Sequence, residues 1–142
     1  MKRSMVPRDL GELARPLEAV DAIRRRSEGG ITTIKALTGN EAFFEGHYPG
    51  FPIYPGVFVL ETVHQSALQY VAAGGGDWRQ ARLREIRSGR FLSPLRPGDV
   101  LTTECACALS NDGSELRVDA TCRNGERAAA AFRLVYATRG QW

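Results

Sequence analysis

Cysteine, histidine and lysine are all scarce in this chain of 142 residues, which holds three cysteines, two histidines and two lysines. The cysteines, Cys105, Cys107 and Cys122, form no CxxC motif and lie near no histidine, so we expect no metal site from them. Their odd number, without a signal for secretion, predicts reduced and half-buried thiols. With only two histidines, a site based on histidine has few places to lie.

Long apolar runs are also missing. Residues 46–60, which no other stretch without a charge exceeds in length, contain three prolines and are followed directly by Glu61. No segment is therefore long and apolar enough to span a bilayer. Near the N-terminus, Arg8, Asp9 and Glu12 interrupt any apolar core of a signal peptide. The sequence therefore predicts a cytoplasmic protein without a membrane partner.

The shortage of lysine makes the positive charge almost entirely arginine. Seventeen of the 19 cationic residues are arginine, and the formal net charge is +3. A GC-rich genome would produce this bias without any functional cause. The functional alternative is an arginine-rich face that receives an acidic or phosphorylated partner. Nucleic acid is not the expected partner, because the arginines are scattered along the predicted strands and form no known reader motif.

The overall composition is that of an ordinary globular protein, with 43% hydrophobic and 25% charged residues, and the length fits one domain over residues 1–142. Residues 1–15 are expected to form an irregular segment. Two strands are expected within residues 18–37, followed by a helix from Val57 to Ala73 that is apolar on nearly every side. Such a helix must be covered, most economically by a sheet. The predicted class is α+β, with one long helix wrapped by a curved antiparallel sheet.

Four further strands are expected after the helix, where apolar and polar residues alternate. Their approximate ranges are 82–92, 101–109, 116–123 and 127–137. If residues 111–114 form a hairpin loop, Cys107 lies opposite Val118 and Cys122 lies opposite Thr103. This register pairs no two cysteines directly, in agreement with reduced thiols.

Three features around the start of the helix could carry chemistry. His47 lies in a loop stiffened by glycine and proline, where a histidine either satisfies a turn or acts on a ligand. Glu61 lies in the apolar helix, where a carboxylate is costly unless it is paired, protonated or turned to solvent. No capping side chain is present at residues 52–55, so the Gly56 N–H is left for a ligand oxygen. Together these groups suit proton transfer beside a carbonyl.

The central segment resembles a known family. Residues 40–50 read NEAFFEGHYPG, residues 52–57 read PIYPGV, and Glu61 and Gln65 follow. This pattern is similar to that of the 3-hydroxyacyl-[acyl-carrier-protein] dehydratases of type II fatty acid synthesis, including the spacing between histidine and glutamate. Residues 90–99, RFLSPLRPGD, are similar to a further segment of that family.

The resemblance implies the hot-dog fold and an obligate dimer, alone or as a trimer of dimers, in which His47 of one subunit faces Glu61 of the other; a heterodimer is an alternative. It implies a substrate on the phosphopantetheine arm of acyl carrier protein, in fatty acid or polyketide synthesis, and no metal or organic cofactor. His47 would remove the C2 proton and Glu61 would assist departure of the C3 hydroxyl. The Gly56 N–H would stabilise the thioester oxygen, and Gln65 would orient Glu61.

The chain departs from the family pattern at three positions. His64 replaces an alanine, and either polarises or narrows the acyl tunnel or packs at the dimer interface. Tyr48 and Tyr54 stand where phenylalanine is common. Such departures suit a polyketide or other secondary pathway. Two other functions stay open: a hot-dog acyl thioesterase, which the pairing of His47 with Glu61 disfavours, and a non-catalytic partner subunit of a heterodimeric dehydratase.

Overall fold

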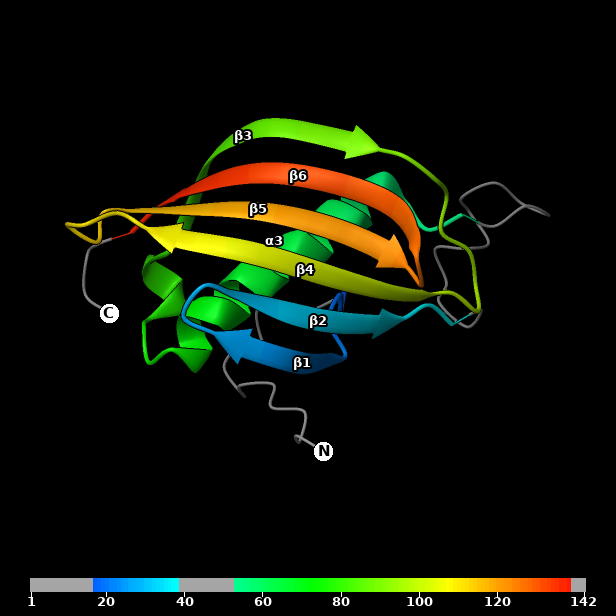
Figure 1. Cartoon of the computed structure of the whole chain (residues 1–142), viewed down its shortest axis with the longest axis horizontal. Helices are drawn as coiled ribbons and strands as arrows, with labels where there is room; N and C mark the ends of the chain where they lie inside the picture. Colours follow the sequence, from blue (N-terminus) through cyan, green and yellow to red (C-terminus); the bar gives the residue numbers. More distant parts are fainter. Residues whose placement is uncertain (1–16, 39–52, 139–142) are drawn as a thin grey trace.

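A computed structural model describes residues 17–38 and 53–138 of the chain. Its elements are β1 (Ala22–Ser27), β2 (Gly30–Ala36), α3 (Gly56–Ala73), the 3₁₀ helix η1 (Trp78–Gln80), β3 (Arg82–Phe91), β4 (Val100–Leu109), β5 (Glu115–Asn124) and β6 (Arg127–Ala137). One curved sheet lies across the long helix α3 (Figure 1). This arrangement confirms the predicted α+β class, whereas η1 was not predicted.

The six strands form one antiparallel sheet in the order β1-β2-β4-β5-β6-β3. The predicted hairpin register is confirmed, because Cys107 pairs with Val118 and Thr103 with Cys122. All three cysteines are free, as expected, but they are buried rather than half-buried. Burial raises the pKa of the Cys107 thiol to about 12, so this thiol stays protonated near neutral pH.

The core lies between α3 and the inner face of the sheet. Apolar side chains alternate along β4 and β5, and the inward ones, including Leu101, Leu116 and Val118, are completely buried. The helix contributes Val63 and Ala67, which are also buried. Since this helix is apolar on most of its circumference, the sheet that covers it supplies most of its stability.

Three buried hydroxyl groups between α3 and β2 are hydrogen-bonded to one another or to helix carbonyl oxygens. The Thr33 hydroxyl on β2 lies 2.7 Å from the Ser66 hydroxyl, which itself donates to the Thr62 carbonyl oxygen at 2.7 Å. The Thr62 hydroxyl donates to the Phe58 carbonyl oxygen at 3.1 Å. The bond between Thr33 and Ser66 joins β2 to α3, so it helps to set the rotation of the helix against the sheet and with it the helix residues that face the functional site.

Strand β3 forms one edge of the sheet and pairs only with β6 in the described part of the chain. Its apolar residues stay exposed, with 38% exposure for Leu83, 49% for Ile86 and 63% for Phe91. A long edge strand with exposed apolar residues is a ready surface for association. Among the described residues, no helix has the length and apolar character needed to cross a membrane.

Candidate functional site

The site begins at the N-terminus of α3, which has no side-chain cap. Pro55 occupies the N-cap position, no acidic residue lies in the first turn, and no side chain of the described residues caps the helix. The Pro55 carbonyl oxygen accepts from the Phe58 and Val59 N–H groups at 2.9 and 3.2 Å. The Gly56 N–H has no partner within the described ranges, and it points along the positive end of the helix dipole. An oxygen that gains negative charge is stabilised at such a position.

A hollow of about 470 Å³ lies beside this helix start, lined mainly by apolar side chains that include Ile53, Phe91 and Leu92. The Phe91 ring packs directly against Gly56, since a Cβ added to Gly56 would lie 2.9 Å from the Phe91 Cε1 atom. A residue other than glycine would push this ring away. The hollow therefore joins an apolar wall to a free backbone N–H.

Glu61 lies one and a half turns further along α3, where it is partly buried. Gln65 Nε2 donates to Glu61 Oε1 at 3.0 Å and to the Leu17 carbonyl oxygen at 3.0 Å. Gln65 Oε1 accepts from the Ala19 N–H at 3.0 Å. Three bonds thus fix the Gln65 amide, and one of them holds a carboxylate oxygen of Glu61.

We expect Gln65→Ala to lower kcat by about tenfold or more, because the Glu61 carboxyl loses the group that orients it. The same change leaves the buried Ala19 N–H without its acceptor, so the free energy of unfolding should fall by about 1–3 kcal/mol. Steady-state kinetics and chemical denaturation measure the two effects. Gln69→Ala is the matched control, since Gln69 is equally buried one turn further along the helix but has no bond to Glu61. An unchanged kcat in the Gln65 variant would contradict an orienting role.

His64 is not hydrogen-bonded to Glu61 but to a tyrosine of the sheet. Its Nδ1 lies 2.8 Å from the Tyr136 hydroxyl, and the two rings are stacked with centroids 5.7 Å apart. Desolvation lowers the pKa of His64, while the nearby Glu61 charge acts in the opposite direction. Burial raises the pKa of Tyr136 far above its ordinary value. Both rings are therefore neutral near neutral pH.

The remaining predicted residues have different outcomes. Tyr54 is 2% exposed, lines the hollow and packs edge-to-face on Phe58. His47 and Tyr48 lie outside the described residues, so their roles stay predictions. Over residues 17–38 and 53–138, no group of three or more His, Cys, Asp or Glu side chains could hold a metal ion.

Four residues of the site were not identified from the sequence: Phe91, Tyr136, Leu17 and Ala19. Phe91 belongs to the motif-like segment 90–99, but nothing in that segment indicates that its ring meets Gly56. Tyr136 lies on a strand that the sequence predicts, and its contact with His64 joins residues 72 positions apart. Leu17 contributes only a carbonyl oxygen, which no side-chain pattern can reveal.

Comparison with known proteins identifies the family of the chain. Residues 23–131 match the model of the ApeI-like family, described as ApeI dehydratase. The FabZ 3-hydroxyacyl-[acyl-carrier-protein] dehydratase of Syntrophotalea carbinolica is 37% identical over 130 residues, which cover 89% of this chain and 88% of that protein. The FabZ enzyme of Thermus thermophilus is 32% identical over 123 residues, which cover 84% and 87%.

Solved structures share the fold at lower identity. The dehydratase heterocomplex ApeI:P from Xenorhabdus doucetiae contains a chain with a TM-score of 0.59 and 19% identity, with coverage of 81% of this chain and 96% of that one. A hypothetical thioesterase from Streptococcus pneumoniae, solved with coenzyme A, has a TM-score of 0.66 and 16% identity, with coverage of 84% and 85%. At these identities the likeness shows the hot-dog fold and nothing about the reaction.

Proposed function

Because the chain belongs to the ApeI-like dehydratase family, we propose that it removes water from 3-hydroxyacyl chains held as thioesters on acyl carrier protein. The observation that carries this proposal is the similarity to FabZ dehydratases over 89% of the chain, in a segment that keeps both His47 and Glu61. The product is the trans-2-enoyl thioester.

The elimination needs one base and one acid. Neutral His47 takes the proton from C2 of the acyl chain, and the electron pair released forms the double bond between C2 and C3. The bond between C3 and its oxygen breaks as Glu61 gives its proton to the departing hydroxyl, which leaves as water. Proton exchange with solvent then restores neutral His47 and protonated Glu61. These steps use side chains alone and need no metal or organic cofactor.

The start of α3 supports the remaining part of the mechanism. Removal of the C2 proton pushes negative charge onto the thioester oxygen, and the Gly56 N–H is a free donor at the positive end of a helix. The apolar hollow beside it, lined by Ile53 and Phe91, suits the acyl chain. We therefore assign the thioester to this end of the molecule.

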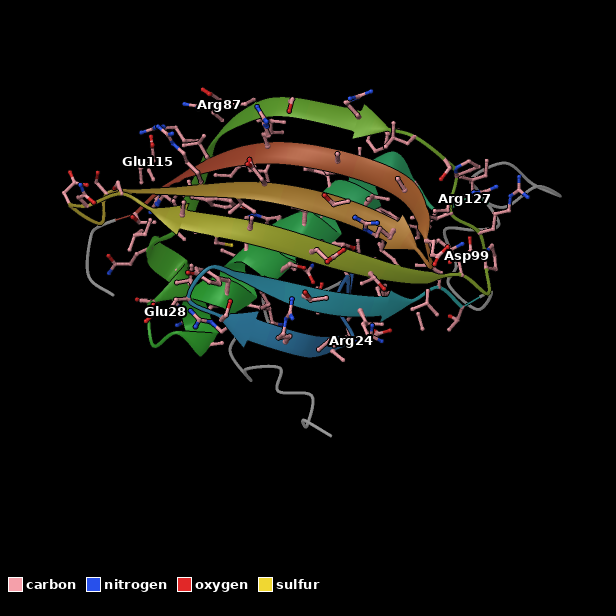
Figure 2. The ribbon with its side chains drawn as sticks, viewed as in Figure 1. Arg24, Glu28, Arg87, Asp99, Glu115 and Arg127 are labelled. Carbon is pink, nitrogen blue, oxygen red and sulfur yellow. The ribbon has the colours of Figure 1, made fainter. Side chains whose placement is uncertain are left out.

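The carrier protein is acidic in the family, and exposed arginines at the same end of the molecule suit it. Arg127, the first residue of β6, lies at the end where α3 begins (Figure 2). Other arginines form salt bridges within the chain. On the outer face of the sheet, Arg123 pairs with Glu104 at 2.9 Å and Arg117 pairs with Glu115 at 3.0 Å. Only part of the arginine excess is thus available to a carrier protein.

The exposed edge of β3 supports assembly into a homodimer. A second copy that packs on Leu83, Ile86 and Phe91 would cover the apolar side chains that this chain leaves exposed. In such a dimer, each active site would combine Glu61 of one subunit with His47 of the other. A heterodimer is the alternative assembly, and the Xenorhabdus dehydratase of the same fold is described as a heterocomplex. The cytoplasmic location stays a prediction.

Ile86→Lys should convert the dimer to monomers, because a charge would be placed in the middle of the proposed interface. Sedimentation velocity measures the change in mass, and kcat should fall with the loss of dimer. Leu109→Lys is the matched control, since Leu109 is also an exposed apolar strand residue, 39% exposed, but lies on β4 away from this edge. A dimer that persists in the Ile86 variant would place the interface elsewhere.

The direct test of the proposed reaction is mass spectrometry of 3-hydroxyacyl carrier protein incubated with the purified protein. We expect the acyl chain to lose the mass of one water while it stays attached to the carrier. Release of free acid would instead indicate a thioesterase. No change at any chain length would contradict a self-sufficient dehydratase and favour a subunit that needs another chain.

A further inference from the structure

The stacked pair formed by His64 and Tyr136 is not explained by the elimination chemistry above. His64 is on α3, three residues after Glu61, and Tyr136 is on β6. The Tyr136 side chain is 0% exposed, and His64 is partly buried. The protonation state and the tautomer of His64 decide which of its ring nitrogens can donate a hydrogen bond beside the proposed acid, Glu61.

The hydrogen bond between the two rings fixes the tautomer of His64. Within the described part of the chain, the hydroxyl of Tyr136 has His64 Nδ1 as its hydrogen-bond partner. A buried O–H group without an acceptor is costly, so the hydroxyl donates its proton to Nδ1. Nδ1 must then be unprotonated, and the neutral imidazole carries its proton on Nε2.

Glu61 lies three residues before His64 on α3, close enough for its carboxylate to act on the His64 imidazole. Residues three positions apart are neighbours on a helix surface, and helical side chains lean towards the N-terminus. His64 therefore leans towards the turn that contains Glu61, and the Glu61 charge acts on its imidazole. Gln65 already holds one carboxylate oxygen, Oε1, which leaves Oε2 for another donor.

We propose that His64 is a positioning residue for Glu61, and that Tyr136 keeps it neutral so that its Nε2–H stabilises the carboxylate that Glu61 becomes when it gives up its proton. This inference rests on the proposed function, in which Glu61 is the acid. The negative charge on Glu61 is fully developed only after proton transfer, so a donor to Oε2 favours the transition state over the ground state. An imidazolium at the same place would instead attract the carboxylate in the ground state as well, so it would not favour the transition state.

The other titratable groups around the pair do not compete with this arrangement. On β4, Cys105 and Cys107 face Tyr136, and burial raises the pKa of both thiols, so they stay neutral. On α3, Glu61 is the titratable group that acts on His64, and its carboxylate charge raises the pKa of His64 against the effect of burial. Acidification therefore reaches the pair through protonation of His64 itself, which breaks the bond from Tyr136 and removes the acid function of Glu61.

Nuclear magnetic resonance of untagged protein tests the state of His64 without any assay of activity. The chain has only two histidines, so a His47→Gln variant has His64 as its single imidazole. We expect its Cε1–H signal to titrate below the ordinary value of about 6.5. Adding Tyr136→Phe should raise this midpoint by about half to one pH unit, because the hydroxyl that favours the neutral ring is lost. Tyr70→Phe is the matched control, since its buried hydroxyl bonds the Glu28 carbonyl oxygen and not His64.

Kinetics on the carrier-bound substrate test the role of His64 in the reaction. His64→Ala should lower kcat about tenfold with little change in KM. His64→Gln should restore most of this loss, because an amide can accept from Tyr136 and donate towards Glu61. Tyr136→Phe should move the acid limb of the pH profile of kcat to higher pH, and Tyr70→Phe should leave it in place.

The outcomes separate this inference from the proposed function. A His64 midpoint at or above 6.5 that Tyr136→Phe does not move would overturn it, and so would an active enzyme whose kcat is the same with alanine and glutamine at position 64. A lowered midpoint together with rescue by glutamine would support it. If the wild-type protein fails to dehydrate any carrier-bound chain, the proposed function fails, and the role of His64 in it fails with it.

Discussion

His47→Ala should lower kcat by about 10²–10⁴-fold, because the C2 proton of the substrate then has no base within reach. The expectation rests on the family-like sequence around His47 and on the spacing from His47 to Glu61. Since alanine removes only the imidazole, KM for the carrier-bound substrate should change little. The rate is measured by quenching the reaction at set times and determining the mass of the acyl carrier protein by mass spectrometry.

The control for this variant is the same substitution at the other histidine of the chain. His64→Ala should cost about tenfold in kcat, far less than the loss at His47, since a positioning residue acts only through Glu61. Equal losses at both positions would contradict the assignment of His47 as the base. A larger loss at His64 would make that residue the base instead.

Glu61→Gln should lower kcat by about 10²–10³-fold, because glutamine cannot give a proton to the departing hydroxyl. The substitution preserves the shape of the site: the new side-chain oxygen can still accept from Gln65 Nε2, which lies 3.0 Å from Glu61 Oε1. The fold should therefore be unaffected, and the thermal midpoint should stay close to that of the wild type. Kinetics and a thermal melt measure the two quantities.

A variant that unfolds would not test the chemistry, so Thr62→Ser serves as a neighbouring control on the same helix. Its hydroxyl can keep the bond to the Phe58 carbonyl oxygen, and kcat should remain near the wild-type value. A folded Glu61→Gln protein with wild-type kcat would show that Glu61 is not the acid. Water or another side chain would then have to supply the proton.

The sequence predicted the fold well because its signals are local. The apolar run that ends at Gly74 defines α3, and a four-residue hairpin loop sets the pairing of Cys107 with Val118. Strand β3 was predicted as a strand, yet its two irregularities, between Leu83 and Glu85 and between Ile86 and Ser88, were not. A bulge changes which face later residues occupy, and no residue type in that strand signals one.

The only residues of the site that could be predicted are those within the family-like sequence motif. Glu61, Gln65 and Gly56 lie on one helix, so their separations follow from helical geometry. The contact of His64 with Tyr136 depends on how α3 is rotated against β6, which is set by packing across the whole core. Gln65 forms hydrogen bonds to backbone atoms of Leu17 and Ala19. Every residue type carries the same backbone carbonyl group, and all except proline carry the N–H group, so the sequence does not indicate which residues form such bonds.

The central claim is that dehydration requires His47 from one subunit and Glu61 from the other, and mixed dimers test it most directly. Inactive His47→Ala and Glu61→Gln proteins are unfolded together, refolded and assayed on 3-hydroxyacyl carrier protein. About half of the dimers are then mixed, and each mixed dimer contains one intact site, so activity should return to about a quarter of the wild-type value. Mixtures that stay as inactive as either variant alone, although mixed dimers form, would contradict a site shared between subunits.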